Sequence, residues 1–142
     1  MARLLPVLTA LLLASAAAAP GAAAGPVPTC DGLAATVILA DGDVPTTGSD
    51  VIIGTAGPDV IHALAGTDTV CGRGGGDTIY GEPGGDHLYG GPGADQLLSG
   101  RGDDFLFGNG GPDDLQPGAG FDVCNGGPGA NTGGPCEAYA VG

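Results

Sequence analysis

One apolar residue recurs at every ninth position through the middle of the chain, and turn-forming residues separate these positions. The apolar residues are Ile52, Ile61, Val70, Ile79, Leu88, Leu97, Leu106, Leu115 and Cys124. Each is the centre of a triplet such as Thr78–Tyr80, and six residues rich in Gly, Pro and Asp precede each triplet. Because side chains alternate along a strand, the central residue points inward and its neighbours outward. The pattern predicts short strands joined by tight turns.

The turns contain an aspartate and a glycine in the same nine-residue phase. The aspartate stands two residues before each apolar position: Asp50, Asp59, Asp68, Asp77, Asp86, Asp95, Asp104, Asp113 and Asp122. The glycine stands two residues before each aspartate: Gly48, Gly57, Gly66, Gly75, Gly84, Gly93, Gly102, Gly111 and Gly120. A disordered Gly-rich linker would explain the composition but not the apolar residue in phase with it. A tenth unit around Asn131 lacks both the acid and the apolar residue, which indicates the end of the array.

Two successive repeats complete one coil of 18 residues, with one strand on each side of the coil. Stacked coils then form two parallel sheets, and each sheet contributes one row of inward apolar side chains. The predicted fold class is therefore all-β: a parallel β-roll, or β-solenoid, with 18 residues per coil. Its core is thin, so apolar burial barely offsets the entropy of ordering the coils, and the turns need another source of stability.

Composition narrows the possible functions. The 142 residues include 31 Gly and 12 Pro, and 16 acidic residues against 3 basic ones give a net charge of −13. Such a charge makes nucleic acid a poor partner. Few large side chains are available for an ordinary globular core, and no Ser or Cys has a base partner in a motif spacing, so we do not expect an enzyme.

The aspartates are candidates for that stabilisation, because residues 18 apart stack on the same edge of the roll, about 4.8 Å apart. One ladder consists of Asp50, Asp68, Asp86, Asp104 and Asp122; the other consists of Asp59, Asp77, Asp95 and Asp113 and ends in Asn131. Without counter-ions such carboxylates repel one another. A Ca²⁺ ion between successive rungs, which also binds turn carbonyls, would meet the preference of calcium for oxygen ligands. The neighbouring aspartate pairs allow up to about seven ions.

Two runs show the repeat best: GEPGGDHLY at residues 81–89 and GGPGADQLL at residues 90–98. They resemble the hemolysin-type (RTX) calcium-binding nonapeptide G-G-x-G-x-D-x-U-x, in the short form that actinobacteria export. The likeness covers about residues 48–131 and implies a β-roll that folds when it binds calcium outside the cell. The implied metal ligands are the nine aspartates above and the turn glycines Gly57, Gly66, Gly75, Gly84, Gly93, Gly102 and Gly111.

The first glycine of this motif is replaced in three repeats, which contain Ala63, Ser99 and Pro117. The resemblance implies weaker calcium binding in the corresponding turns, which end at Asp68, Asp104 and Asp122.

The N-terminal segment has the features of a secretory signal peptide. Arg3 is positively charged, Leu4–Ala14 is apolar, and the stretch to Ala24 offers small-residue cleavage sites. The apolar run is short for a membrane span, although an uncleaved anchor is the alternative. We predict a signal peptide (1–24), an N-terminal cap segment (25–47), the calcium-binding β-roll (48–131) and a C-terminal cap (132–142). The mature protein would be secreted.

Four cysteines in a short exported chain indicate two disulfides. Cys71 and Cys124 lie three predicted coils apart on one sheet, about 14 Å, which exceeds the reach of a disulfide. Of the two remaining connectivities we favour Cys30–Cys71 with Cys124–Cys136, since it ties each terminal segment over an open end of the roll. In this arrangement Cys71 faces outward, and residues 36–39 form a capping strand.

The outer faces of the two sheets differ. One face holds Tyr89, Phe105 and Phe107 at neighbouring positions. The competing interpretation is therefore a calcium-dependent adhesion or protein-interaction module that uses this aromatic face, with an unknown protein or cell-surface partner. His62 and His87 lie on different predicted sheets without a third ligand, so we expect exposed strand residues there and no histidine metal site.

Overall fold

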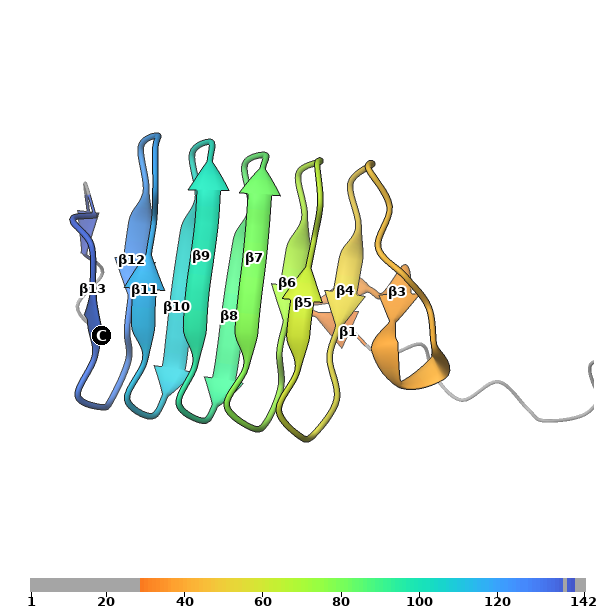
Figure 1. Ribbon diagram of the computed structural model, residues 1–142, viewed down its shortest axis with the longest axis horizontal. Helices are drawn as coiled ribbons and strands as arrows, with labels where there is room; N and C mark the ends of the chain where they lie inside the picture. Colours follow the sequence, from red (N-terminus) through yellow and green to blue (C-terminus); the bar gives the residue numbers. More distant parts are fainter. Residues whose placement is uncertain (1–28, 137, 140–142) are drawn as a thin grey trace, which may run out of the picture.

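The computed structural model describes residues 29–136 and 138–139, and the predicted signal peptide lies outside them. These residues wind into a roll of stacked coils that advances from the orange end to the blue end (Figure 1). Regular structure in the described residues is β-strand except for one 3-10 helix, η1 (Leu39–Asp41). The prediction of an all-β parallel roll is confirmed.

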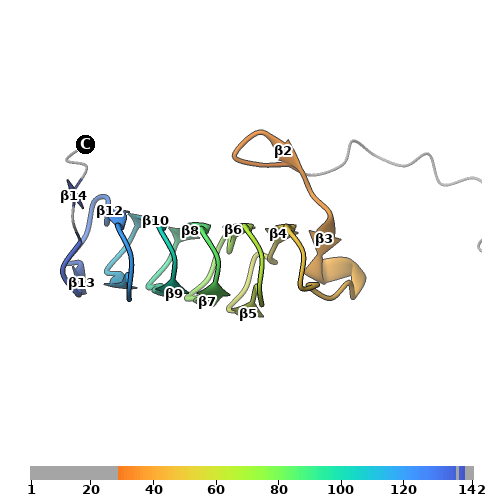
Figure 2. The same ribbon diagram turned by 90° about the horizontal axis from the view of Figure 1, so that it is seen from above.

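Two parallel sheets form the walls of the roll and face each other across a narrow interior (Figure 2). The seven-stranded wall contains, in spatial order, β14 (Ala138–Tyr139), β12 (Val123–Asn125), β10 (Phe105–Gly110), β8 (His87–Pro92), β6 (Thr69–Cys71), β4 (Val51–Ile53) and β3 (Val37–Ile38). The five-stranded wall contains β13 (Thr132–Gly133), β11 (Asp114–Gln116), β9 (Gln96–Arg101), β7 (Thr78–Pro83) and β5 (Val60–His62). Consecutive repeats alternate between the walls.

The register between coils is 18 residues, as the repeat predicts. Ile79 on β7 pairs with Leu97 on β9 in parallel register. Strands β7 to β10 are six residues long, twice the predicted triplet, because uninterrupted repeats keep the following turn residues paired as well; Glu82, for example, pairs with Gly100. The regular ladder therefore continues beyond the triplets into the turns.

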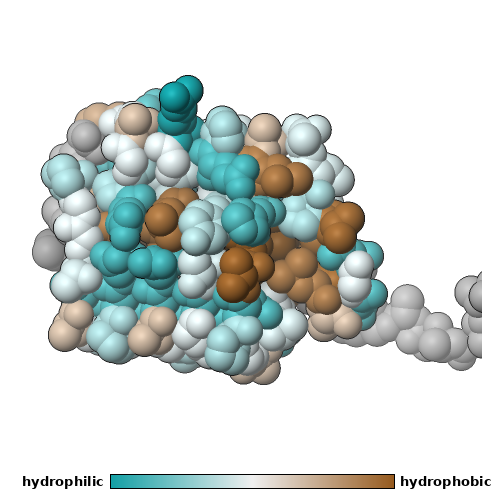
Figure 3. Space-filling view, in the orientation of Figure 1, coloured by the Kyte–Doolittle hydropathy of each residue, from teal (hydrophilic) through white to brown (hydrophobic). Residues whose placement is uncertain are grey.

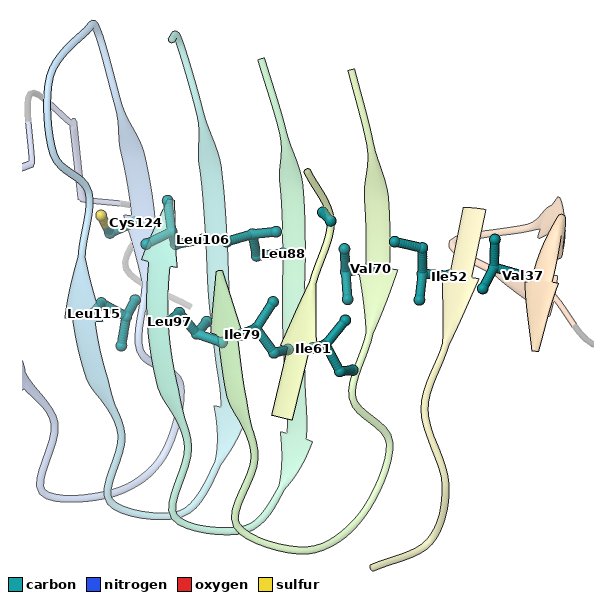
Figure 4. Close-up of a cluster of buried hydrophobic side chains, with 11 residues drawn as sticks. Val37, Ile52, Ile61, Val70, Ile79, Leu88, Leu97, Leu106, Leu115 and Cys124 are labelled. Atoms are coloured by element: carbon teal, nitrogen blue, oxygen red, sulfur yellow. The ribbon is translucent and has the colours of Figure 1, made fainter. Parts of the chain in front are cut away.

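The hydrophobic core is the double row of inward residues that the periodicity predicts (Figure 4). Seven of them, Ile52, Val70, Ile79, Leu88, Leu97, Leu106 and Cys124, have no exposed surface, and Ile61 and Leu115 are almost as buried. Val37 on β3 extends one row at the N-terminal end because it pairs with Ile52 on β4. Ala63 joins the same core cluster from a position next to a turn. The core is one side chain thick on each wall.

The N-terminal segment covers part of the seven-stranded wall. An antiparallel hairpin of β1 (Thr29–Cys30) and β2 (Leu33–Ala34) projects from that side of the roll (Figure 2). A disulfide joins Cys30 to Cys71, with 5.8 Å between their Cα atoms, and Ile53 is only 2 % exposed although it lies on the outside of its strand. The favoured pairing and the predicted capping strand, observed as β3, are both present.

The C-terminal end of the roll is tied by the second disulfide. Cys124 in the core row is bonded to Cys136, and Cys136 packs against the core cluster. The strands β13 and β14 add one further strand to each wall, on β11 and β12 respectively. Within the described residues, no helix is long and apolar enough to cross a membrane.

On the face seen in Figure 3, the side of the five-stranded wall, apolar side chains gather towards the N-terminal end of the roll and the remainder is mostly polar. On the seven-stranded wall the aromatic side chains stack from coil to coil: Tyr89 and Phe107 are parallel, with ring centroids 4.9 Å apart, and His87 lies 4.7 Å from Phe105. On the five-stranded wall, His62 stacks on Tyr80, and its Nδ1 atom lies 2.9 Å from Oε1 of Glu82. The ring spacing follows the spacing of the coils.

Candidate metal-binding turns

The turns form two long edges of the roll, and each edge contains one aspartate ladder. Turns that run from the five-stranded to the seven-stranded wall, such as the one from β7 to β8 at the top of Figure 1, form what we name the Asp86 edge. Turns that run in the opposite direction form the Asp95 edge. The carboxylates of eight rungs are buried: Asp50, Asp68, Asp77, Asp86, Asp95, Asp104, Asp113 and Asp122.

From the second rung of each ladder onward, one carboxylate oxygen is hydrogen-bonded to the preceding coil. The Oδ1 atom accepts a hydrogen bond from the backbone N–H of the aspartate 18 residues earlier, so that Asp95 bonds to Asp77 at 2.8 Å and Asp86 to Asp68 at 2.9 Å. The same bond recurs along both edges at 2.7 to 3.0 Å. This N–H to Oδ1 hydrogen bond therefore recurs along the whole length of each ladder. The spacing of the aspartates alone does not predict it.

The other carboxylate oxygen has no hydrogen-bond partner on six successive inner rungs. These atoms are Oδ2 of Asp68, Asp77, Asp86, Asp95, Asp104 and Asp113. An unsatisfied buried polar group costs roughly 1–3 kcal/mol, and more if it is charged. Six such atoms in register therefore indicate that a ligand completes the turns.

Electrostatics lead to the same conclusion. Burial raises the pKa of Asp86 to about 7, with the charges of Asp104 and Asp68 adding to the increase and a backbone hydrogen bond opposing it. Burial likewise raises the pKa of Asp95 to about 6, and Asp77 and Asp113 add to it. The pKa values of the other four inner rungs are raised for the same main reason. A cation beside each oxygen would remove this penalty.

Four of the six unpartnered oxygens lie beside a glycine that stands five residues earlier in the chain: those of Asp77, Asp86, Asp95 and Asp113. At Gly81, a Cβ atom would lie 2.7 Å from Asp86 Oδ2 and 2.7 Å from the carbonyl oxygen of Ser99. At Gly72 the hypothetical Cβ likewise meets Asp77 Oδ2 and, at 2.7 Å, the carbonyl oxygen of Gly90. Two oxygens of different coils thus converge on a space that only glycine leaves free.

The ends of the ladders show which groups fit this space. At Asn131, the last rung of the Asp95 edge, Oδ1 accepts the N–H of Asp113 as an aspartate would, while Nδ2 donates to the carbonyl of Gly127 at 2.8 Å. At the first rung of that edge, Thr55 donates to Asp59 Oδ2 through its N–H at 2.7 Å. Neutral hydrogen-bond donors therefore occupy the Oδ2 side of the rung at both ends of this ladder.

Thr46 makes the same contact on the other edge. Its N–H donates to Asp50 Oδ2 at 2.7 Å and its hydroxyl at 2.9 Å. Inner rungs have no such donor. Because Asp rungs offer only acceptors, a cation is the group that fits between their Oδ2 atoms and the neighbouring carbonyls.

Comparison with known families agrees with this geometry. The model of the RTX calcium-binding nonapeptide repeat matches the chain four times, at residues 45–79, 72–106, 80–115 and 100–132. These matches cover more than half of the chain. The chain belongs to the RTX calcium-binding nonapeptide repeat family. Searches of curated proteins and of solved structures each returned no match.

Membership of the RTX family identifies the predicted cation as calcium, and the donor set suits it. Carboxylate and carbonyl oxygens are the ligands that Ca²⁺ prefers. No three His, Cys, Asp or Glu side chains of the described residues converge on one point. A site in these turns would therefore combine few carboxylates with several backbone carbonyls.

Sequence reasoning placed the RTX aspartates correctly on the edges but did not single out every contributing group. The carbonyls that face Oδ2 belong to the residue five positions before the next aspartate of the same edge, such as Gly90 before Asp95. The predicted turn glycines, such as Gly66 and Gly84, lie back to back in successive coils, where a Cβ would clash with the neighbouring carbonyl. In the sequence, the residues that supply the carbonyls facing Oδ2 could have been found from the first position of the motif, where its first glycine stands.

Proposed function

We propose that this chain is a secreted calcium-binding protein in which Ca²⁺ ions bind between the turns of successive coils and complete the β-roll. The observation that supports this function is the row of buried, unpartnered Oδ2 atoms beside glycine-lined spaces. Calcium binding is its biochemical activity, and we infer no catalytic role.

Each group in a turn has a defined part in holding an ion. The Oδ1 atom stays bonded to the preceding coil, while Oδ2 and the facing carbonyl, such as Asp77 Oδ2 and Gly90 O, are the oxygens that would hold the ion. A bound Ca²⁺ would supply the positive charge that these oxygens lack. Because the two oxygens come from different coils, each ion would join one coil to the next.

Calcium binding and folding would be coupled. Without ions, folding buries carboxylates of like charge in a roll that has only a thin core. We infer that the chain folds after export, where calcium is plentiful, with affinities of the order of 10⁻⁴ to 10⁻³ M. Disulfides and RTX repeats are typical of extracellular proteins, and the predicted signal peptide and cap boundaries (1–24, 25–47, 132–142) belong to the same proposal.

Far-ultraviolet circular dichroism of the oxidised chain, titrated with CaCl₂ and with MgCl₂ as the control, tests the function. We expect a cooperative gain of β-sheet signal with calcium alone, because Mg²⁺ is smaller and gives up its water ligands reluctantly. A disordered spectrum unchanged by calcium would refute the proposal. A fully folded spectrum unaffected by calcium would also refute it, since the ladders would then be stable without ions.

A second candidate function is a calcium-dependent interaction module. The stacked Tyr89 and Phe107 rings, together with the partly exposed Phe105, form an aromatic surface on the seven-stranded wall. The double variant F105S/F107S tests it. If this surface mediates self-association, sedimentation shows less association while calcium binding persists; if calcium binding falls instead, the rings serve the fold alone.

A further inference from the structure

The two edges of the roll differ at the residue five positions before each aspartate, where the motif has its first glycine. On the Asp95 edge this residue is always glycine: Gly54, Gly72, Gly90, Gly108 and Gly126. On the Asp86 edge the corresponding residues are Pro45, Ala63, Gly81, Ser99 and Pro117. All of the substitutions fall on one edge, so the two ladders are not equivalent.

This residue adjoins the space in which we place the ion. Ala63 and Ser99 are both fully buried at this position, and Gly81 is buried as well. The Cβ position at Gly81 is 2.7 Å from each of the two oxygens that an ion would join, Asp86 Oδ2 and Ser99 O. Any side chain here therefore takes up room between the carboxylate and the carbonyl of the next coil.

Ser99 shows such a replacement directly. Its hydroxyl donates a hydrogen bond to the carbonyl oxygen of Pro117. This carbonyl has the same place in the turn ending at Asp104 as the carbonyl of Ser99 has in the turn ending at Asp86. In the turn ending at Asp68, the methyl group of Ala63 belongs to the hydrophobic core instead. Both turns thus have a side chain where the other turns have space.

We propose that this chain binds four calcium ions, three in a continuous row on the Asp95 edge and one on the Asp86 edge. The row corresponds to Asp77, Asp95 and Asp113, and the single site to Asp86. These are the buried rungs with both an unpartnered Oδ2 atom and a glycine five residues earlier. The inference rests on the proposed calcium-binding function and adds which turns perform it.

The first rungs are satisfied without an ion. Asp50 and Asp59 receive hydrogen bonds from Thr46 and Thr55 on the Oδ2 atom. At the other end of the Asp95 edge the amide of Asn131 bonds to Gly127. The ion row on this edge is therefore bounded at both ends by side chains that replace an ion.

Counting bound ions tests the proposal. We would measure calcium per chain by equilibrium dialysis at saturation, in a background of Mg²⁺, on the oxidised full chain. Wild type should bind four ions. The variants A63G and S99G remove the obstructing side chain without adding atoms, so each should bind one more ion, and the double variant two more. Ala94→Gly is the matched control, because it makes the same kind of change at an exposed turn position and should leave the count at four.

The outcomes separate the inference from the function on which it rests. No bound calcium in wild type would refute the proposed function itself. A count of six or seven, unchanged in A63G and S99G, would leave the function intact and refute the asymmetry. A count that rises in A63G and S99G but not in the control supports the proposal.

A second measurement locates the ions. In an amide nitrogen–proton NMR spectrum of the calcium-loaded chain, small amounts of Mn²⁺ exchange into the calcium sites and broaden nearby signals. We expect losses along the whole Asp95 edge, in the turns that end at Asp77, Asp95 and Asp113. On the Asp86 edge we expect losses centred on Asp86 and weaker broadening in the end turns, which end at Asp50 and Asp122. Equal broadening on both edges would overturn the proposal.

Discussion

Replacing Asp95 by asparagine should change the stability of the roll in opposite directions with and without calcium. Asn131 provides the template, because its Oδ1 atom keeps the bond to the preceding coil while its Nδ2 atom donates to a turn carbonyl. In D95N the amide oxygen would keep the hydrogen bond from the N–H of Asp77. The amide NH2 group would replace Oδ2 and donate to a turn carbonyl, so that no ion is needed there. Asp95 is 3 % exposed, so its electrostatics are those of a buried group.

The size of the effect follows from the pKa of Asp95. Burial raises the pKa of Asp95 to about 6 in the roll, against about 3.9 for a free aspartate, so at pH 7.5 the ionised group destabilises the calcium-free roll by about 3 kcal/mol. D95N removes this penalty. With calcium at about 1,000 times the dissociation constant, losing the site removes roughly 4.1 kcal/mol of stabilisation, which exceeds the gain of about 3 kcal/mol by about 1 kcal/mol. The variant should therefore be more stable than wild type in EGTA and less stable in calcium.

The assay is the folded fraction by circular dichroism, measured in EGTA across a series of trimethylamine oxide concentrations and in saturating calcium across a urea series. Asp41→Asn is the control, because it removes the same charge from an exposed position on η1. If D95N were less stable than wild type under both conditions, or behaved like the control, the assignment of Oδ2 as the ion-binding atom would be wrong.

Three further predictions concern pH, the disulfides and the core. Burial raises the folded-state pKa values of Asp86 (to about 7) and Asp95 (to about 6) above their unfolded values, so the calcium-free roll is most stable below about pH 4 and loses this stability as the pH rises through 6 to 7. Circular dichroism of the chain, stripped of calcium beforehand and kept in calcium-free buffer, should show more β-sheet at pH 4.5 than at pH 7.5. The reverse trend would contradict the buried carboxylates. The variant C30S/C71S removes a link between residues 41 positions apart, and its free energy of unfolding, measured with urea in calcium, should fall by about 4 kcal/mol. C124S/C136S, with a separation of 12, should lose about 3 kcal/mol. Equal losses would argue against loop entropy as the cause. L97A should lose about 2–5 kcal/mol in the same assay because Leu97 is fully buried, whereas the exposed Val60→Ala should lose less than about 1 kcal/mol.

Much of the fold follows from the nine-residue period. A residue at a fixed phase in an uninterrupted repeat has the same neighbours in every coil, so the inward row, the two walls and the stacked aspartates could all be predicted. The same register excluded Cys124 as the partner of Cys71 and left two connectivities, of which the favoured one, Cys30–Cys71 with Cys124–Cys136, is present. The strands proved longer than predicted, since turn residues such as Glu82 also pair between coils.

The candidate site was predictable only in part, because a residue's phase does not determine the direction of its hydrogen bonds. The sequence indicated that Asp77 and Asp95 stack, but it did not indicate that Asp95 Oδ1 accepts the N–H of Asp77. Nor did it single out Thr46 and Thr55, which are hydrogen-bond donors to the first rungs.

The period, the two ladders and the family motif can be recognised without a structure, since they depend on which residue types recur at a fixed spacing. The packing of the coils determines which carboxylate oxygen is left without a partner and which spaces are open to an ion. Those properties depend on how one coil lies on the next. Ser99, for example, bonds to the carbonyl of Pro117, 18 residues away, and only the contact between coils brings the hydroxyl and that carbonyl together.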